Sequence, residues 1–224
     1  MLRFKGQLDV LINAAGVVNR KSLKQATLVD WDKSKVHIIR VAMTINVRGM
    51  FQMISMSIPF LKDSKGVIVN VSATAGNKPE VGGLVFSVSK SMVNMLTKCT
   101  ALELAGFGIR VNAVAPSFVD TPARITAGEA CMNMQKEEYE EFKRRTENTI
   151  PLEVKHQDKI LKPEEVADTI LWLASSDASY ITGEILTIDG GQELTTNLYN
   201  FHKEDMVTLL LQLNIESRIR EGNT

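Results

Sequence analysis

The sequence predicts an α/β protein built on a doubly wound parallel sheet. Three runs are apolar on both faces, as buried parallel strands are: LDVLINAA (8–15), VIVNV (67–71) and IRVNAVAP (109–116). Between them lie segments whose apolar residues recur every three or four positions, which is the period of an amphipathic helix. Strands that alternate with helices in this way favour a parallel sheet with helices packed on it.

Length and composition limit the class of protein. At 224 residues the chain is long enough for one well-packed domain. Lys plus Arg and Asp plus Glu each number 26, so no basic excess favours nucleic-acid binding. No apolar run approaches ~20 residues, so we expect no membrane span. The N-terminus lacks a secretory signal and the two cysteines lack a pairing pattern, so we expect an intracellular protein, cytoplasmic or in an organellar matrix.

The chain is expected to divide into residues 1–195, an α/β domain, and residues 196–224, an amphipathic helical extension. Residues 27–62 are predicted to be mostly helix, and a second helix is predicted to begin at Lys90 and end before Gly106. The C-terminal extension carries Met206, Leu209 and Leu213 at helical spacing, so we expect it to dock on another surface.

Four motifs occur in a fixed order along the chain. The first strand ends in Asn13-Ala14-Ala15-Gly16, and a helix carries Asn46-Val47-Arg48-Gly49. Residues 66–90, GVIVNVSATAGNKPEVGGLVFSVSK, join a strand to a helix through a Gly- and Pro-containing turn. A last strand ends in Asp189-Gly190-Gly191. In this order the motifs resemble the short-chain dehydrogenase/reductase family over about residues 8–194, which implies a Rossmann-type fold.

The resemblance also implies which residues belong to the site. Asn46 and Lys90 match catalytic positions of the family. The positions that match the nicotinamide end of its cofactor site are Asn13, Ala14, Gly16, Lys90, Pro116 and Thr121. Where the family has its catalytic Ser and Tyr, this chain has Ala73 and Phe86. No metal site is predicted, because His37 has no second ligand nearby.

Ala73 and Phe86 decide the functional prediction. Loss of a general acid alone lowers a rate on the order of 10²–10⁴-fold. Neighbouring hydroxyls are expected to point elsewhere, since adjacent strand residues face opposite sides. We therefore expect a catalytically inactive family member that acts as a structural or regulatory subunit. The alternative is an NAD(P)-dependent oxidoreductase that is incompletely represented by this sequence.

The family's first half is expected to be missing. The family has a strand, a Gly-rich turn and further elements before the strand that corresponds to residues 8–15. The resemblance thus implies a partial doubly wound sheet without the first βαβαβ half, and strand 8–15 at its edge. Because the Gly-rich turn holds the pyrophosphate of a dinucleotide, we expect no cofactor; the alternative is NADP or NAD.

A protein partner or self-association is also expected. An exposed strand edge is commonly covered by another chain. The resemblance implies pairing through the helices that run from Met50 to Leu61 and from Val88 to Leu104. A two-fold contact needs one self-complementary apolar patch, for which we expect Met50, Ile54, Met92 and Met95.

Overall fold

The computed structural model describes residues 6–18, 38–79, 82–121, 136–153 and 159–195. Its strands are β1 (Val10–Asn13), β2 (Val67–Val71), β3 (Arg110–Pro116) and β4 (Ile185–Ile188). They form one four-stranded sheet in the order β1-β2-β3-β4, and every neighbouring pair is parallel. The predicted α/β class with a parallel sheet is confirmed.

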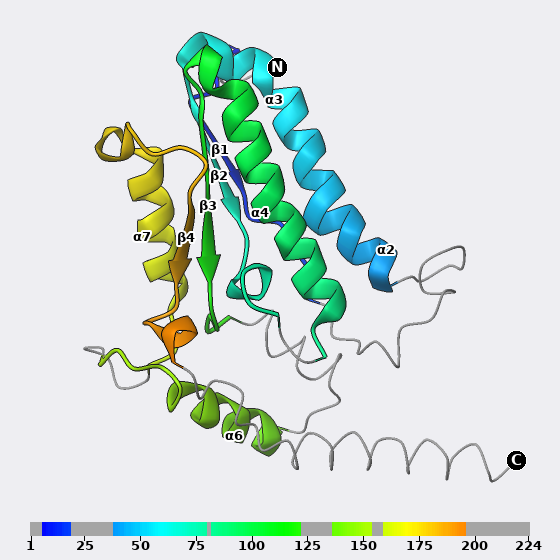
Figure 1. Ribbon diagram of the computed structural model, residues 1–224, viewed down its shortest axis with the longest axis vertical. Helices are drawn as coiled ribbons and strands as arrows, with labels where there is room; N and C mark the ends of the chain where they lie inside the picture. Colours follow the sequence, from blue (N-terminus) through cyan, green and yellow to red (C-terminus); the bar gives the residue numbers. More distant parts are fainter. Residues whose placement is uncertain (1–5, 19–37, 80–81, 122–135, 154–158, 196–224) are drawn as a thin grey trace, which may run out of the picture.

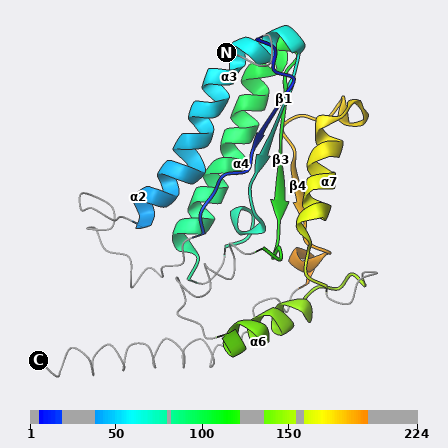
Figure 2. The same ribbon diagram turned by 180° about the vertical axis from the view of Figure 1, so that it is seen from behind.

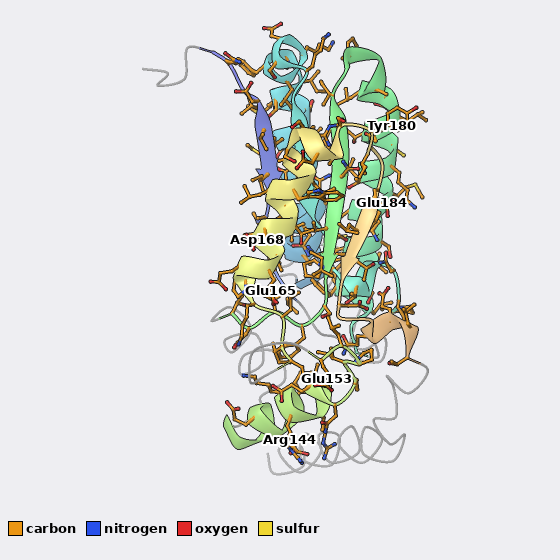
Figure 3. The ribbon with its side chains drawn as sticks, turned by 90° about the vertical axis from the view of Figure 1, so that its left-hand side faces the viewer. Arg144, Glu153, Glu165, Asp168, Tyr180 and Glu184 are labelled. Carbon is orange, nitrogen blue, oxygen red and sulfur yellow. The ribbon has the colours of Figure 1, made fainter. Side chains whose placement is uncertain are left out.

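Helices cover both faces of the sheet, as the doubly wound prediction requires (Figure 1). The helices α2 (Ile38–Met43), α3 (Met50–Ser64) and α4 (Leu84–Leu104) lie on one face, and α7 (Pro163–Ala174) lies on the other. Figure 2 shows the same two layers from behind, and Figure 3 views α7, with Glu165 and Asp168 labelled, in front of the sheet. The helix α6 (Lys136–Glu147) lies beyond the carboxyl ends of the strands.

Short helical segments join these elements. A π-helical segment, Thr44–Gly49, connects α2 to α3. The 3₁₀ turns are Thr74–Gly76, Ala105–Phe107, Ser176–Ala178 and Gln192–Leu194. Residues 19–37 and 196–224 are outside the described part, so the predicted helical start, His37 and the predicted C-terminal extension fall there.

The strand register sorts the core into two layers. Leu11 pairs with Ile68, which pairs with Val111, and all three contact the α3–α4 layer. Val67 and Val69 point to the opposite face and pack against α7. The apolar residues on both faces of the strands therefore reflect burial on both sides of the sheet.

Among the described residues, β1 lies at the edge of the sheet and pairs with β2. Its inner-facing Leu11 and Asn13 are buried, whereas Val10 and Ile12 on the α7 side are 37% and 45% exposed. Whether a partner covers this edge stays a prediction.

The predicted apolar patch is correct for one helix and wrong for the other. Met92 and Met95 of α4 are exposed, but Met50 and Ile54 of α3 are each 4% exposed. The helical period turns Met50 and Ile54 toward the sheet together with Leu61, where they contribute to the core. The exposed apolar residues of α3 are instead Phe51, Met53, Met56 and Phe60.

Candidate functional site

The predicted site residues gather where parallel strands end. Gly16 follows β1, Ala73 follows β2, and Pro116 ends β3. Carboxyl ends of parallel strands meet at one edge of a sheet, which is where ligands bind in open α/β folds. At this edge of the sheet, Gly16 lies next to both Asn46 and Lys90.

Asn46 is fully buried in the π-helical segment between α2 and α3. Its Oδ1 accepts a hydrogen bond from the Val17 N–H at 2.8 Å, and its Nδ2 donates to the Val17 carbonyl at 3.0 Å. The same Nδ2 donates to Ser89 Oγ at 3.0 Å. π-Helical segments often occur at functional sites. Here the π-helical segment positions the Asn46 side-chain amide, which holds the chain after Gly16 and contacts α4.

Lys90 carries a buried ammonium group. The residue is 6% exposed, and its Nζ donates to the Val71 carbonyl at 2.8 Å at the end of β2. Burial lowers the pKa of Lys90 from 10.5 to about 8. Burial is the whole cause, so no carboxylate of the described residues offsets it. Buried groups whose pKa is shifted toward neutrality are typical of functional sites.

The two positions without hydroxyls lie beside this group. Phe86 precedes Lys90 by one helical turn, and the Lys90 Nζ is 5.7 Å from the centre of its ring. The ring is partly buried and has no proton to donate. Ala73 is extended, at φ −164°, and begins the turn Thr74–Gly76 without a side-chain cap.

Two glycines allow the close packing around Lys90. A Cβ on Gly76 would lie 2.8 Å from the Lys90 carbonyl carbon and 2.9 Å from its oxygen. Real side chains essentially never approach backbone this closely, so the turn after β2 reaches α4 because residue 76 is glycine. A Cβ on Gly16 would lie 3.3 Å from Asn46 Oδ1 and 3.6 Å from Lys90 Nζ.

Several positioning residues were missed by sequence reasoning. Ser89 accepts a hydrogen bond from Asn46 and donates one to the Phe86 carbonyl at 2.8 Å. Asn13 donates to Asn70, which donates to Thr97, each at 2.9 Å. Ser72 donates to Asn94 and to the Lys90 carbonyl. The sequence signal for these residues is a polar side chain at a core-facing position, for example Asn70 within VIVNV.

Two further atoms at this edge are buried without a hydrogen-bond partner among the described residues: Ser117 Oγ, after β3, and Glu193 Oε1, after β4. Burial, and then the charge of Asp189, raises the pKa of Glu193. Pro116 is buried and Thr121 partly buried, and no hydrogen bond between described residues joins Thr121 to Asn46 or Lys90. Ala14 is exposed beside Asn13, which is buried.

Within the described ranges, no three His, Cys, Asp or Glu side chains come together as metal ligands would. None of the helices there is long and apolar enough to cross a membrane.

Known proteins identify the class. A family profile described as "Enoyl-(Acyl carrier protein) reductase" matches residues 2–193. A 3-oxoacyl-[acyl-carrier-protein] reductase of Thermotoga maritima is 37% identical over 83% of this chain and 66% of its own length. The 2,3-dihydro-2,3-dihydroxybenzoate dehydrogenase of Escherichia coli is 32% identical over 84% of this chain and 71% of its own. The chain belongs to the short-chain dehydrogenase/reductase family.

Solved structures share the fold. A short-chain dehydrogenase/reductase of Caenorhabditis elegans, solved with cofactor, superposes with a TM-score of 0.69 at 31% identity, covering 85% of this chain and 67% of its own. ElxO with NADP bound gives a TM-score of 0.67 at 26% identity, with coverages of 85% and 69%. The chain spans about two thirds of the length of the relatives it matches.

These findings correct two predictions. The expectation of a catalytically inactive structural or regulatory subunit is wrong, because similar proteins over most of the chain are named reductases and dehydrogenases. The expectation of no cofactor is wrong, because structural neighbours hold cofactor. The prediction rested on the missing hydroxyls at Ala73 and Phe86. Proton transfer needs a positioned group of suitable pKa, not one residue type.

Gly76→Ala should destabilise the protein by about 1–3 kcal/mol, because the new Cβ pushes the turn away from the α4 backbone at Lys90. Urea unfolding measures the loss. Gly16→Ala is the matched control and should cost less, since its nearest contacts are side-chain atoms at 3.3 and 3.6 Å. Equal losses in the two variants would contradict the proposed packing.

Lys90→Met should stabilise the protein at pH 7 by about 1–2 kcal/mol. The lowered pKa means that the charged Lys90 destabilises the fold below about pH 8, and that this cost disappears between about 8 and 10.5. Loss of the hydrogen bond to Val71 offsets part of the gain. The advantage of the variant, from urea unfolding, should shrink as pH rises through this window. A variant that is less stable at pH 7 would contradict the assigned environment.

Proposed function

We propose that the protein is an NAD(P)-dependent oxidoreductase that interconverts a carbonyl compound and its alcohol. The observation that carries the proposal is the buried Lys90 ammonium, held by the Val71 carbonyl beside Gly16 and Asn46 at the carboxyl edge of the sheet. The named activities of the relatives support the same class of reaction.

The residues of this edge fit the nicotinamide end of a dinucleotide. The Lys90 ammonium has three N–H donors, and the described residues give it one acceptor, so donors are available for ribose hydroxyls. The unpaired Ser117 Oγ at the end of β3 offers another polar contact. Gly16 leaves space for a ring or sugar to approach Asn46 and Lys90. When bound, the nicotinamide would donate or accept a hydride.

In this proposal, Ala73 and Phe86 occupy the positions of the family's catalytic Ser and Tyr. Asn46 and Ser89 hold the chain around Lys90, and Asn13 is fixed by Asn70. Ala14, Pro116 and Thr121 line the nicotinamide end by resemblance. Lys90 is the ionisable side chain among these residues, so its protonation state determines the charge beside a bound substrate.

The purified protein should oxidise NADPH or NADH in the presence of ketones, with thioesters of 3-oxo acids included because of the acyl-carrier-protein reductases among its relatives. Substrate-dependent loss of absorbance at the reduced nicotinamide band measures the activity. Asn46→Leu should lower it, because the variant frees both the chain after Gly16 and the contact to α4. An exposed control, Glu103→Gln on α4, should leave it unchanged. No turnover across both cofactors would contradict the proposal.

We also propose that two copies associate through α3 and α4. Val88, Met92, Met95 and Leu102 recur at the helical period along α4 and are exposed, and α3 exposes Phe51, Met53, Met56 and Phe60. Exposed apolar patches of this kind commonly mark interfaces. The flexible methionines allow the patch to pack against itself around a two-fold axis, which supports a second copy as the occupant.

Met95→Glu should therefore shift the protein toward monomer. Met95 is 60% exposed at the centre of α4, and a two-fold contact would bury two glutamates without partners. Sedimentation velocity measures the mass. Leu171→Glu on α7, at 62% exposure on the opposite layer, is the matched control and should keep the wild-type mass. An unchanged mass in both variants would contradict this interface.

A further inference from the structure

At the position where the family has its proton-donating tyrosine, this chain has Phe86. The proposed chemistry needs an acid that gives a proton to the carbonyl oxygen as the carbon is reduced. Phe86 has no ionisable proton, and Ala73 has no hydroxyl. We propose that Lys90 itself transfers this proton, an inference that rests on the proposed oxidoreductase function.

The position of Lys90 supports this role. Phe86 and Lys90 are four residues apart on α4, so their side chains leave the same helical face. The ammonium is 5.7 Å from the centre of the Phe86 ring, so it adjoins the space that the ring borders. In this proposal, one water molecule links the ammonium to a carbonyl oxygen in front of the phenylalanine ring.

The surroundings of Lys90 favour release of a proton. The described groups around the ammonium are the Val71 carbonyl from β2, Gly16 after β1 and Phe86 from its own helix, with Asn46 on the other side of Gly16. None of these groups is charged, so no carboxylate among the described residues holds the proton on the amine. Burial alone shifts the pKa to about 8, close to the pH at which a general acid works best.

The neighbouring hydroxyls are less suited to this role. Ser89 Oγ is committed to Asn46 and to the Phe86 carbonyl, and Ser72 Oγ to Asn94 and the Lys90 carbonyl. A serine also needs an adjacent base to gain or lose a proton near neutral pH. In contrast, the ammonium has donors beyond the one that Val71 accepts.

The proton balance is complete. When bound, the reduced nicotinamide would supply a hydride to the carbonyl carbon, and the π pair of the C=O bond would move to the oxygen. That oxygen forms an O–H bond as a Lys90 N–H bond breaks, through the linking water. Lys90 is left as a neutral amine and regains a proton from solvent at the exposed Gly16 edge. Oxidation of the alcohol runs the same steps backward, with the neutral amine as the base.

The test compares Lys90 variants in turnover and in cofactor binding. In the wild-type protein, the reduction rate at saturation should fall as pH rises through about 8, because the ammonium is lost. Lys90→Met and Lys90→Ala should lower this rate by at least about 10²-fold. Added methylamine or ethylamine should restore turnover to Lys90→Ala, which a structural role would not allow. Lys98→Ala, an exposed lysine of the same helix, should behave as wild type.

A second readout separates proton transfer from cofactor binding. Lys90→Arg keeps a positive charge and hydrogen-bond donors but does not release its proton near neutral pH. The fluorescence of NADPH should therefore report binding within a few-fold of wild type, while turnover is lost. If Lys90→Met or Lys90→Ala keeps wild-type turnover, or if amines restore nothing, the inference is overturned while the oxidoreductase function stands. If the wild-type protein itself has no turnover, the proposed function fails and the inference fails with it.

Discussion

The site depends on one electrostatic constraint, the burial of the Lys90 ammonium without a carboxylate partner among the described residues. A buried cation is costly unless other groups solvate it. Here the Val71 carbonyl at the end of β2 provides the acceptor at 2.8 Å. The backbone of Lys90 is in turn held by the turn after β2, where Gly76 allows direct contact and Ser72 donates to the Lys90 carbonyl. The strand end and the helix therefore position the same residue from both sides.

In the proposed function, stability and activity oppose each other at this position. An apolar side chain at position 90 suits the buried environment better than an ammonium does, but it cannot exchange a proton. Functional sites commonly retain such unfavourable groups because catalysis requires them. The buried amides around Lys90 follow another principle. Asn46, Asn13 and Asn70 are each paired through their side chains, so they rigidify the carboxyl edge without adding charge.

Sequence reasoning identified the strands and the residues at their carboxyl ends, because two-faced apolar runs and motif order constrain both. It named Asn46 and Lys90 as site residues and assigned no role to Ser89 or Gly76, whose contacts join segments that periodicity does not relate. It placed Met50 and Ile54 on the surface because helical spacing identifies an apolar face but not whether that face packs on the sheet. The functional prediction rested on the absence of Tyr and Ser, which is visible in the sequence, whereas the pKa of Lys90 is set by burial in the folded protein.

The most direct test of this account is a titration of Lys90 by NMR. With ¹³C at the lysine ε-carbons, the Lys90 signal can be assigned as the one missing from Lys90→Met. The account predicts a titration midpoint near 8, since burial disfavours the ammonium and no carboxylate stabilises it. A midpoint near the ordinary value of 10.5 would contradict the account, because Lys90 would then be solvated or paired with an acidic group.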